Sequence, residues 1–185
     1  MRTLSSAIAL TTAAAALAAG SAGTAAAAPA TPAPAQQLVL HSWTLLNEHG
    51  PGPNPGERLT AWVDARTVDG RPRGHVVVQH VFERTGTTRA ELDVDCLTVA
   101  GDGAITVTGP IAQTVVTPYG GEPYLFEEGL HPEAGLTFYP TDEQHQRRVG
   151  WQRTGAPGGS EVVRCGAVSP SLWIIDGGTF LRRTR

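Results

Sequence analysis

The sequence predicts an all-β protein, either an antiparallel sandwich or a closed barrel, built from about nine to ten short strands and one disulfide. Apolar and polar residues alternate with a period of two along most of the chain after residue 37, as they do in half-buried strands. Turn sequences rich in Gly, Pro, Asn and Asp separate these runs. No segment after residue 37 has an apolar stripe long enough for a helix, so we expect strands to form the core.

The first part of the chain has the three-part pattern of a secretory signal peptide. A short basic start precedes an apolar, alanine-rich run at 4–19, and 25–27 is a small-residue triplet suited to cleavage. This run is too short for a transmembrane helix, which needs about 20 apolar residues, so we expect a secreted, extracellular protein with no membrane anchor. The expected organisation is a signal peptide at 1–27, a Pro/Ala-rich linker at 28–37 and a single β-rich domain at 38–185.

The charged residues exclude several classes of function. The formal net charge is −3 at pH 7, which offers no basic surface to nucleic acid or to an anionic membrane. Every basic side chain other than histidine is an arginine. Because the sequence contains no lysine, Schiff-base and lysine-nucleophile chemistry are excluded.

The predicted strands can be placed in order along the chain. The first candidate, 38–46, carries Trp43 and precedes a long loop at 47–57, whose three prolines and three glycines exclude a helix or an inner strand. The run 73–83 is apolar on both faces, which is typical of a central strand. The other candidates are 58–68, 136–139, 148–153, 162–165, 172–175 and 179–181, with turns at 69–72 and 176–178.

Residues 91–111 form the clearest predicted hairpin, because the dipeptide Asp102-Gly103 lies between two alternating runs. With this dipeptide as the centre of the turn, Leu97 is expected opposite Thr108. That register places one set of apolar side chains together on the face that should meet the core. The set is Leu92, Val94, Cys96, Ile105, Val107 and Ile111.

The two cysteines, Cys96 and Cys165, are expected to form one disulfide, since oxidation is the usual state of cysteine in an exported chain. The disulfide would join the central hairpin to the last quarter of the sequence. The alternative is that one of them is a catalytic or metal-binding thiol.

The hairpin also carries a resemblance to a known family. Residues 94–99 read VDCLTV, residues 101–104 read GDGA and residues 107–109 read VTG. This pattern resembles an uncharacterised family of exported proteins from high-GC Gram-positive bacteria, whose members show a VDCLxVxG run followed by an alternating strand that ends in glycine. The resemblance covers 73–112 and, more loosely, 160–181. It implies the fold and the extracellular location, and it implies no activity.

Isolated polar groups give weaker functional signals. His75 and His80 are five residues apart, so on a strand they point to opposite faces and do not chelate one ion together. The acidic run Glu91, Asp93 and Asp95 could hold a hard cation such as Ca²⁺, or it could be a solvated face that protects a sheet edge. No zinc-protease, paired CxxC, EF-hand, GxSxG or phosphate-loop motif occurs, and no metal or cofactor is predicted.

The segment 117–134 combines aromatic side chains with carboxylates and an imidazole, as ligand sites do. Its glycines and prolines indicate a loop, so the spacing of these residues does not define their geometry. A pairing of His131 with Glu127 or Glu128 could act as acid and base or bind Zn²⁺. The candidate ligand-binding residues are Tyr119, Tyr124, Phe126, Glu127, Glu128 and His131.

From these patterns we expect a secreted, non-catalytic binding module whose partner is a small molecule, a glycan or another extracellular protein. The export pattern, the expected disulfide and the lack of a catalytic motif favour this interpretation over the alternatives. One alternative is a small extracellular hydrolase or metal-assisted enzyme that uses the loop at 117–134. The other alternative is a structural component of an extracellular matrix.

Overall fold

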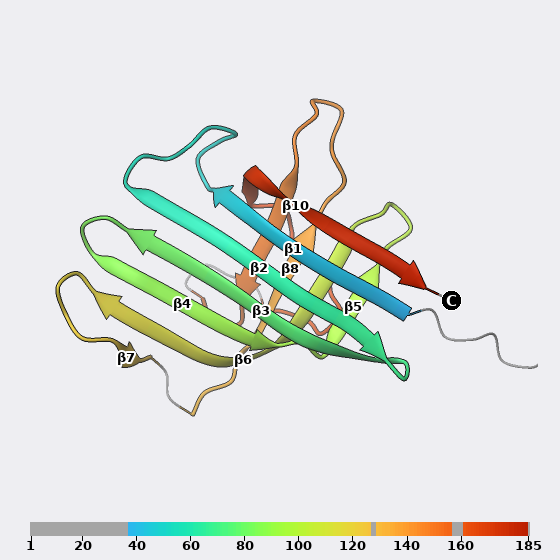
Figure 1. The fold of residues 1–185 in the computed structure, drawn as a ribbon, viewed down its shortest axis with the longest axis horizontal. Coiled ribbons are helices and arrows are strands. Elements are labelled where there is room, and N and C mark those ends of the chain that lie inside the picture. Colours follow the sequence, from blue (N-terminus) through green and yellow to red (C-terminus); the bar gives the residue numbers. More distant parts are fainter. Residues whose placement is uncertain (1–36, 127–128, 157–160, 185) are drawn as a thin grey trace, which may run out of the picture. The chain divides into compact units, whose positions relative to one another are not determined.

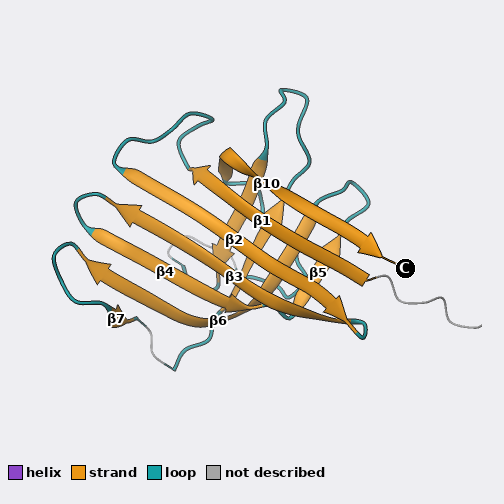
Figure 2. Ribbon diagram, in the orientation of Figure 1, coloured by secondary structure: helices purple, strands orange, loops and turns teal. Residues whose placement is uncertain are grey.

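The computed structural model describes residues 37–126, 129–156 and 161–184. All of these belong to one compact unit, Pro34–Arg185. Figure 2 shows that the regular elements in these ranges are strands, with no helix among them. It follows that no helix within those ranges could span a membrane. The predicted signal peptide, 1–27, and nearly all of the predicted linker lie outside the described residues.

Within the described ranges, ten antiparallel strands make up a single sheet, so the predicted all-β architecture is confirmed. The strands are β1 (Gln37–Asn47), β2 (Glu57–Val68), β3 (Arg71–Phe82), β4 (Gly86–Asp93), β5 (Cys96–Val99), β6 (Ile105–Pro118), β7 (Tyr124–Leu125), β8 (Glu133–Phe138), β9 (Arg148–Arg153) and β10 (Leu172–Thr184). Hydrogen-bonded neighbours follow the order β4-β3-β2-β1-β10-β9-β8-β6-β5, and β4 also pairs with β6. The order therefore returns on itself through β6, and the sheet is ring-like without being a barrel.

The ring-like sheet is folded into two layers, which is a sandwich-like arrangement. In Figure 1, β1, β2, β3, β4 and part of β10 form a front layer, and β5, β8 and β9 cross behind it. The long strand β6 belongs to both layers, because its first half pairs with β5 and β8 and its second half pairs with β4. An extra residue in β6, Ala112, interrupts the pairing with β4, since Ile111 pairs with Leu92 and Gln113 with Glu91. Such a bulge bends a strand and reverses which residues face inward.

The core lies between the two layers. Alternate residues of the front strands point into it, because successive side chains of a strand face opposite sides. The buried side chains from both layers form one cluster. Its largest fully buried members are Leu40, Val63, Val76, Leu92, Val107, Ile111, Leu136 and Val149.

The turn between β2 and β3 lies within the predicted turn at 69–72, but it is shorter because β3 already begins at Arg71. Val68 pairs with Arg71, so Asp69-Gly70 is a two-residue loop. Both residues have positive φ, 50° for Asp69 and 74° for Gly70, as a type I′ turn requires. Aspartate and glycine tolerate that conformation better than other residues.

The predicted register of the central hairpin is wrong by one residue. Leu97 lies opposite Val107, not Thr108, because the loop contains three residues, 101–103. Gly103 has a φ of 92°, and the amide of Ala104 donates to the side chain of Asp102, 2.9 Å away. A three-residue loop with a left-handed glycine is a regular hairpin alternative to the two-residue Asp-Gly turn.

The one-residue difference moves Cys96 to the other face of β5. Val94 and Leu97 both belong to the core cluster, so the inward positions shift from even to odd numbers between β4 and β5. Cys96 is buried on the opposite side, where it forms the predicted disulfide with Cys165, with a Cα–Cα distance of 5.4 Å. The disulfide prediction is thus confirmed, although its first cysteine was placed on the wrong face.

Two further predictions about the last quarter of the chain are wrong. Residues 162–165 are not a strand but part of an irregular segment, 161–171, that packs beside β5 and β8. Residues 176–178 are not a turn, because β10 continues through them from Leu172 to Thr184. The pairing of β10 with β1 shifts at a bulge at Ile175, and Gly177, two residues further along, has a φ of 92°.

Candidate functional site

A cavity of about 770 Å³ lies between the layers, and it is the candidate functional site. Strands β2, β3, β4 and β6 provide one wall, and β9 with the residue Ala156 beyond it provides the other. Aliphatic and aromatic side chains dominate the first wall, and the second wall combines Trp151 and Ala156 with the polar Gln152 and Arg153. The lining residues are Glu48, Leu59, Val78, His80, Phe82, Thr88, Ala90, Thr114, Val116, Tyr124, Phe126, Trp151, Gln152, Arg153 and Ala156.

The period of two in the front strands explains the first wall. On β3, the side chains of Val78, His80 and Phe82 lie on the inner face, and Phe82 stacks on His80 with ring centroids 3.8 Å apart. On β6, the bulge at Ala112 makes even-numbered residues the inward ones, so Val116 reaches the cavity. The part of this wall that β4 and β6 form includes small side chains, such as Ala90, which fill less of the space between the layers.

Tyr124 and Phe126 form the rim of the cavity. β7 holds them there, since Tyr124 pairs with Val116, and the amide of Phe126 donates to the carbonyl of Thr114 at 2.8 Å. Both aromatic side chains remain about half exposed, at 50% for Tyr124 and 41% for Phe126. An exposed aromatic ring at the edge of an apolar cavity can bury further area when a ligand enters.

Polar groups occupy a few positions around the apolar walls. The Nε2 atom of His80 lies 3.7 Å from a carboxylate oxygen of Glu57, which orients the imidazole. Glu48 and Arg153 bring one negative and one positive charge to the lining. A few polar groups in an apolar cavity are the usual means of orienting a bound molecule.

The structure brings two of the six predicted ligand-binding residues to this cavity, Tyr124 and Phe126. Tyr119 does not line it and is 76% exposed in the turn after β6. His131 also lies elsewhere, with its Nδ1 atom 2.9 Å from the carbonyl oxygen of Ile111. Glu127 and Glu128 lie outside the described residues.

Sequence reasoning missed most of the cavity walls, including Val78, His80, Phe82 and Trp151. A signal for β3 was present, because Val78, His80 and Phe82 alternate along one face of a strand whose two faces are both largely apolar. The contribution of β9 had no local signal. Trp151 reaches the cavity only because the ring-like order places β9 across from β3 and β4.

The acidic run that could have bound calcium does not form a cluster. Glu91 is 2.7 Å from Arg89 and 3.2 Å from the Nε2 atom of His75, while Asp95 is 2.9 Å from Arg164. Among the described residues, no three His, Cys, Asp or Glu side chains gather to hold a metal ion. His75 and His80 lie on opposite faces of β3, as predicted, since one faces Glu91 and the other lines the cavity.

A second polar region lies beside the disulfide, away from the cavity. Burial raises the pKa of Glu133 above its ordinary value of 4.5, and the nearby negative charge of Asp95 raises it further. A hydrogen bond from Thr108 and the positive charge of Arg164 act in the opposite direction. One carboxylate oxygen each of Asp95 and Glu133 is buried without a hydrogen-bond partner among the described residues. The protonation of this carboxylate pair therefore bears on the stability of the fold.

The chain was compared with protein-family models, with curated proteins and with solved structures, and nothing matches in any of the three comparisons. The resemblance to a family of exported proteins stays a prediction. We therefore infer the function from the geometry of this chain.

Proposed function

We propose that this protein is a non-catalytic binding module that takes a small, largely apolar molecule into the cavity between its layers. The observation that carries the proposal is a preformed, apolar-lined cavity with two half-exposed aromatic side chains at its rim. Its volume of about 770 Å³ falls within the range of roughly 300–1,000 Å³ that small-molecule sites occupy.

The lining also indicates the class of ligand. Leu59, Val78 and Val116 offer aliphatic surface in the interior, where a hydrocarbon or ring system would gain from leaving water. The two charged side chains of the lining, Glu48 and Arg153, have opposite signs, so the site has no strong preference for an anion or a cation. An amphipathic molecule without net charge fits this combination best.

The disulfide supports the proposal that the protein acts outside the reducing cytosol. Disulfides persist in oxidising compartments and are rare where glutathione keeps thiols reduced. Cys96 and Cys165 are bonded, and no cysteine is free. Secretion, a signal peptide and an extracellular location are the natural extension of this finding and belong to the proposal.

The proposal is tested by titration with N-phenyl-1-naphthylamine, a neutral apolar probe whose fluorescence rises when it leaves water. We expect saturable binding at one site per chain. The double variant Tyr124→Ala/Phe126→Ala should weaken binding at least tenfold, which corresponds to about 1.4 kcal/mol, while the melting temperature stays nearly unchanged.

The matched control is Tyr119→Ala, which removes an exposed tyrosine that does not line the cavity. This variant should bind the probe like the unmodified protein. Absence of saturable binding, or full affinity in the double variant, would refute the proposal. If the double variant unfolds, the single variant Phe126→Leu keeps apolar volume and should still reduce affinity by removing the ring.

A further inference from the structure

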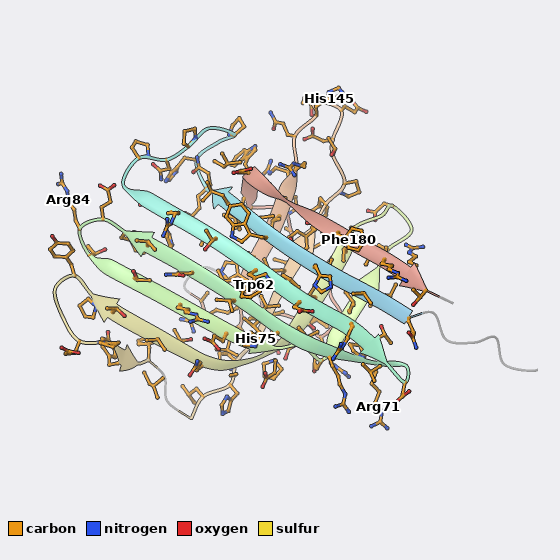
Figure 3. The ribbon with its side chains drawn as sticks, in the orientation of Figure 1. Trp62, Arg71, His75, Arg84, His145 and Phe180 are labelled. Atoms are coloured by element: carbon orange, nitrogen blue, oxygen red, sulfur yellow. A yellow bond between two sulfur atoms is a disulfide. The ribbon has the colours of Figure 1, made fainter. Side chains whose placement is uncertain are left out.

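Three large aromatic side chains lie exposed on the outer face of the front layer. Trp43 on β1, Trp62 on β2 and Phe180 on β10 are 49%, 60% and 60% exposed. We call these three residues the aromatic platform. Figure 3 shows Trp62 near the middle of the front layer and Phe180 over β10. Exposed aromatic residues that gather in one place on a sheet differ from the single apolar side chains that scatter over any protein surface.

Strand register places the members of the aromatic platform on neighbouring positions. Trp43 lies directly opposite Trp62, so both indoles rise from the same side of the sheet. Phe180 lies opposite His41, two residues from Trp43 along β1. From the spacing of strands and residues, Trp62 and Phe180 are separated by roughly 12 Å across the sheet. The platform thus runs diagonally over three adjacent strands.

Two glycines in β10 shape the surroundings of Trp43: Gly178 leaves open space, and Gly177 allows the ring to approach the backbone. Gly178 is paired with Trp43, and a Cβ atom added at Gly178 would meet nothing within 4 Å. A Cβ atom added at Gly177 would lie 2.7 Å from the Cε3 atom of Trp43. The indole therefore leans over the backbone of β10 at a place where any other residue would obstruct it. This arrangement leaves open space next to the ring.

The aromatic platform is separate from the cavity. In the front layer the cavity is lined by inward side chains, such as Leu59 on β2 and Val78 on β3. Trp62 is three residues from Leu59 on β2, so the two side chains lie on opposite faces of the strand and Trp62 faces outward. One layer of strands thus carries the cavity on its inner face and the aromatic platform on its outer face.

Two carboxylates near the aromatic platform are paired with basic side chains. The Nδ1 atom of His41 lies 3.4 Å from Asp64, and Glu91 contacts both His75 and Arg89. The same face also carries the exposed side chains of Arg66, Arg73 and Arg182. The groups beside the rings can therefore both donate and accept hydrogen bonds, as the hydroxyl groups of a sugar require.

We propose that the aromatic platform binds an extended, neutral polysaccharide through stacking of its sugar rings on Trp43, Trp62 and Phe180. One face of a pyranose ring presents C–H groups, and these match the negative face of an aromatic ring. Hydroxyl groups at the edge of the sugar can exchange hydrogen bonds with the paired His41 and Asp64. An extended glycan suits a broad sheet face, because successive sugars can reach successive strands.

The exposed area favours a glycan over a second copy of this chain. Fully buried aromatic side chains cover about 150–250 Å² each, so three half-exposed ones offer roughly 300–400 Å². A stable protein–protein interface needs about 800 Å² from each partner. The aromatic platform therefore provides about half of the area that self-association requires.

Retention on solid polysaccharide tests the proposal. The probes are microcrystalline cellulose and chitin, with native gel electrophoresis through hydroxyethyl cellulose as a soluble counterpart. We expect the unmodified protein to be retained on at least one probe, and Trp43→Ala/Trp62→Ala to lower its affinity at least tenfold. Tyr119→Ala is the control, because it removes an exposed aromatic outside the aromatic platform and should change nothing.

Two further variants separate stacking from other effects. Trp62→Leu keeps an apolar side chain but removes the ring, so it should weaken retention, and Trp62→Tyr should restore part of it. Tyr124→Ala/Phe126→Ala should bind polysaccharide normally, and Trp43→Ala/Trp62→Ala should bind N-phenyl-1-naphthylamine normally, so that the two sites can fail independently. The proposal is overturned if none of the three glycans binds, or if retention survives Trp43→Ala/Trp62→Ala. It is also overturned if sedimentation velocity shows a dimer that these substitutions abolish.

Discussion

Cys96 and Cys165 join β5 to a segment that has no strand pairing of its own. They are 69 residues apart in sequence, and two neighbouring contacts reinforce the link. The amide of Cys165 donates to the hydroxyl of Thr108 at 3.0 Å, and Arg164 forms an ion pair with Asp95 at 2.9 Å. The segment 161–171 is therefore held against the back layer by a covalent bond and side-chain contacts.

Removing the disulfide should reduce stability without changing the fold class. In the chain-entropy model, a bridge that closes a 69-residue loop stabilises the folded state by about 4 kcal/mol. Urea unfolding of Cys96→Ala/Cys165→Ala should show a loss of that order, with far-UV circular dichroism still typical of a β protein. A thiol assay on the unfolded, unreduced parent protein should find no free thiol, and two free thiols would contradict the bond.

The partly buried carboxyl group of Glu133 should make stability depend on pH. Its pKa is raised in the folded state, so between the unfolded value near 4.5 and the folded value the native protein binds more protons than the unfolded chain. The stabilisation from protonated Glu133 is fully present below the unfolded pKa. It is lost as the pH rises through the folded pKa. Glu133→Gln should remove this decline and be more stable than the parent above the window.

The control for that experiment is Glu143→Gln, which changes an exposed carboxylate in the loop between β8 and β9. Its unfolding free energy should follow the parent protein across the same pH range, measured by urea titration at each pH. If Glu133→Gln shows the same decline as the parent between pH 4 and pH 7, another group is responsible.

A methyl group at Gly109 should disrupt the point where β6 passes from one layer to the other. A Cβ atom there would lie 1.9 Å from the carbonyl oxygen of Asp93, and backbone atoms cannot move aside as a flexible side chain can. We expect Gly109→Ala to cost about 1–3 kcal/mol or more by thermal or urea unfolding. Gly101→Ala, where an added Cβ meets nothing within 4 Å, should be close to neutral.

The secretion pattern can be tested directly on exported material. We expect a mature N-terminus at Ala28, or within about two residues of it, because the small-residue triplet at 25–27 suits signal peptidase. Intact-mass spectrometry of culture supernatant measures this position. A secreted chain that still begins with Met1 would contradict the signal-peptide prediction.

The alternation of apolar and polar residues was sufficient to predict the strands whose pairing partners are near in sequence. The predictions at 38–46, 58–68 and 73–83 agree with β1, β2 and β3 within about two residues, because alternation and the Asp69-Gly70 turn point to the same structure. The same reasoning failed at Asp102, since Asp-Gly also occurs in a three-residue loop. One added loop residue moves every side chain of a short strand to the other face.

Contacts between residues that are far apart in the sequence could not be predicted from the local sequence pattern. Asp176 to Gly178 has the composition of a turn, yet all three residues pair with β1. The local sequence likewise predicts Tyr124 and Phe126 as aromatic residues of a ligand-binding loop. That they line a cavity depends on Trp151 and the rest of β9, which come from a distant part of the sequence.

The adjacency of β1 and β10 has a consequence for how this chain folds. Gln37 pairs with Thr184, so the first strand completes its hydrogen bonding only after nearly the whole described sequence has been synthesised. Until then, one edge of β1, with Trp43 beside it, has no neighbour and is open to pairing with other chains. Contacts that join the two ends of a sequence raise the contact order and slow folding, typically to milliseconds or seconds. A circular permutant that links these two strands and opens the loop at 48–56 would turn that late contact into a local one and should fold faster.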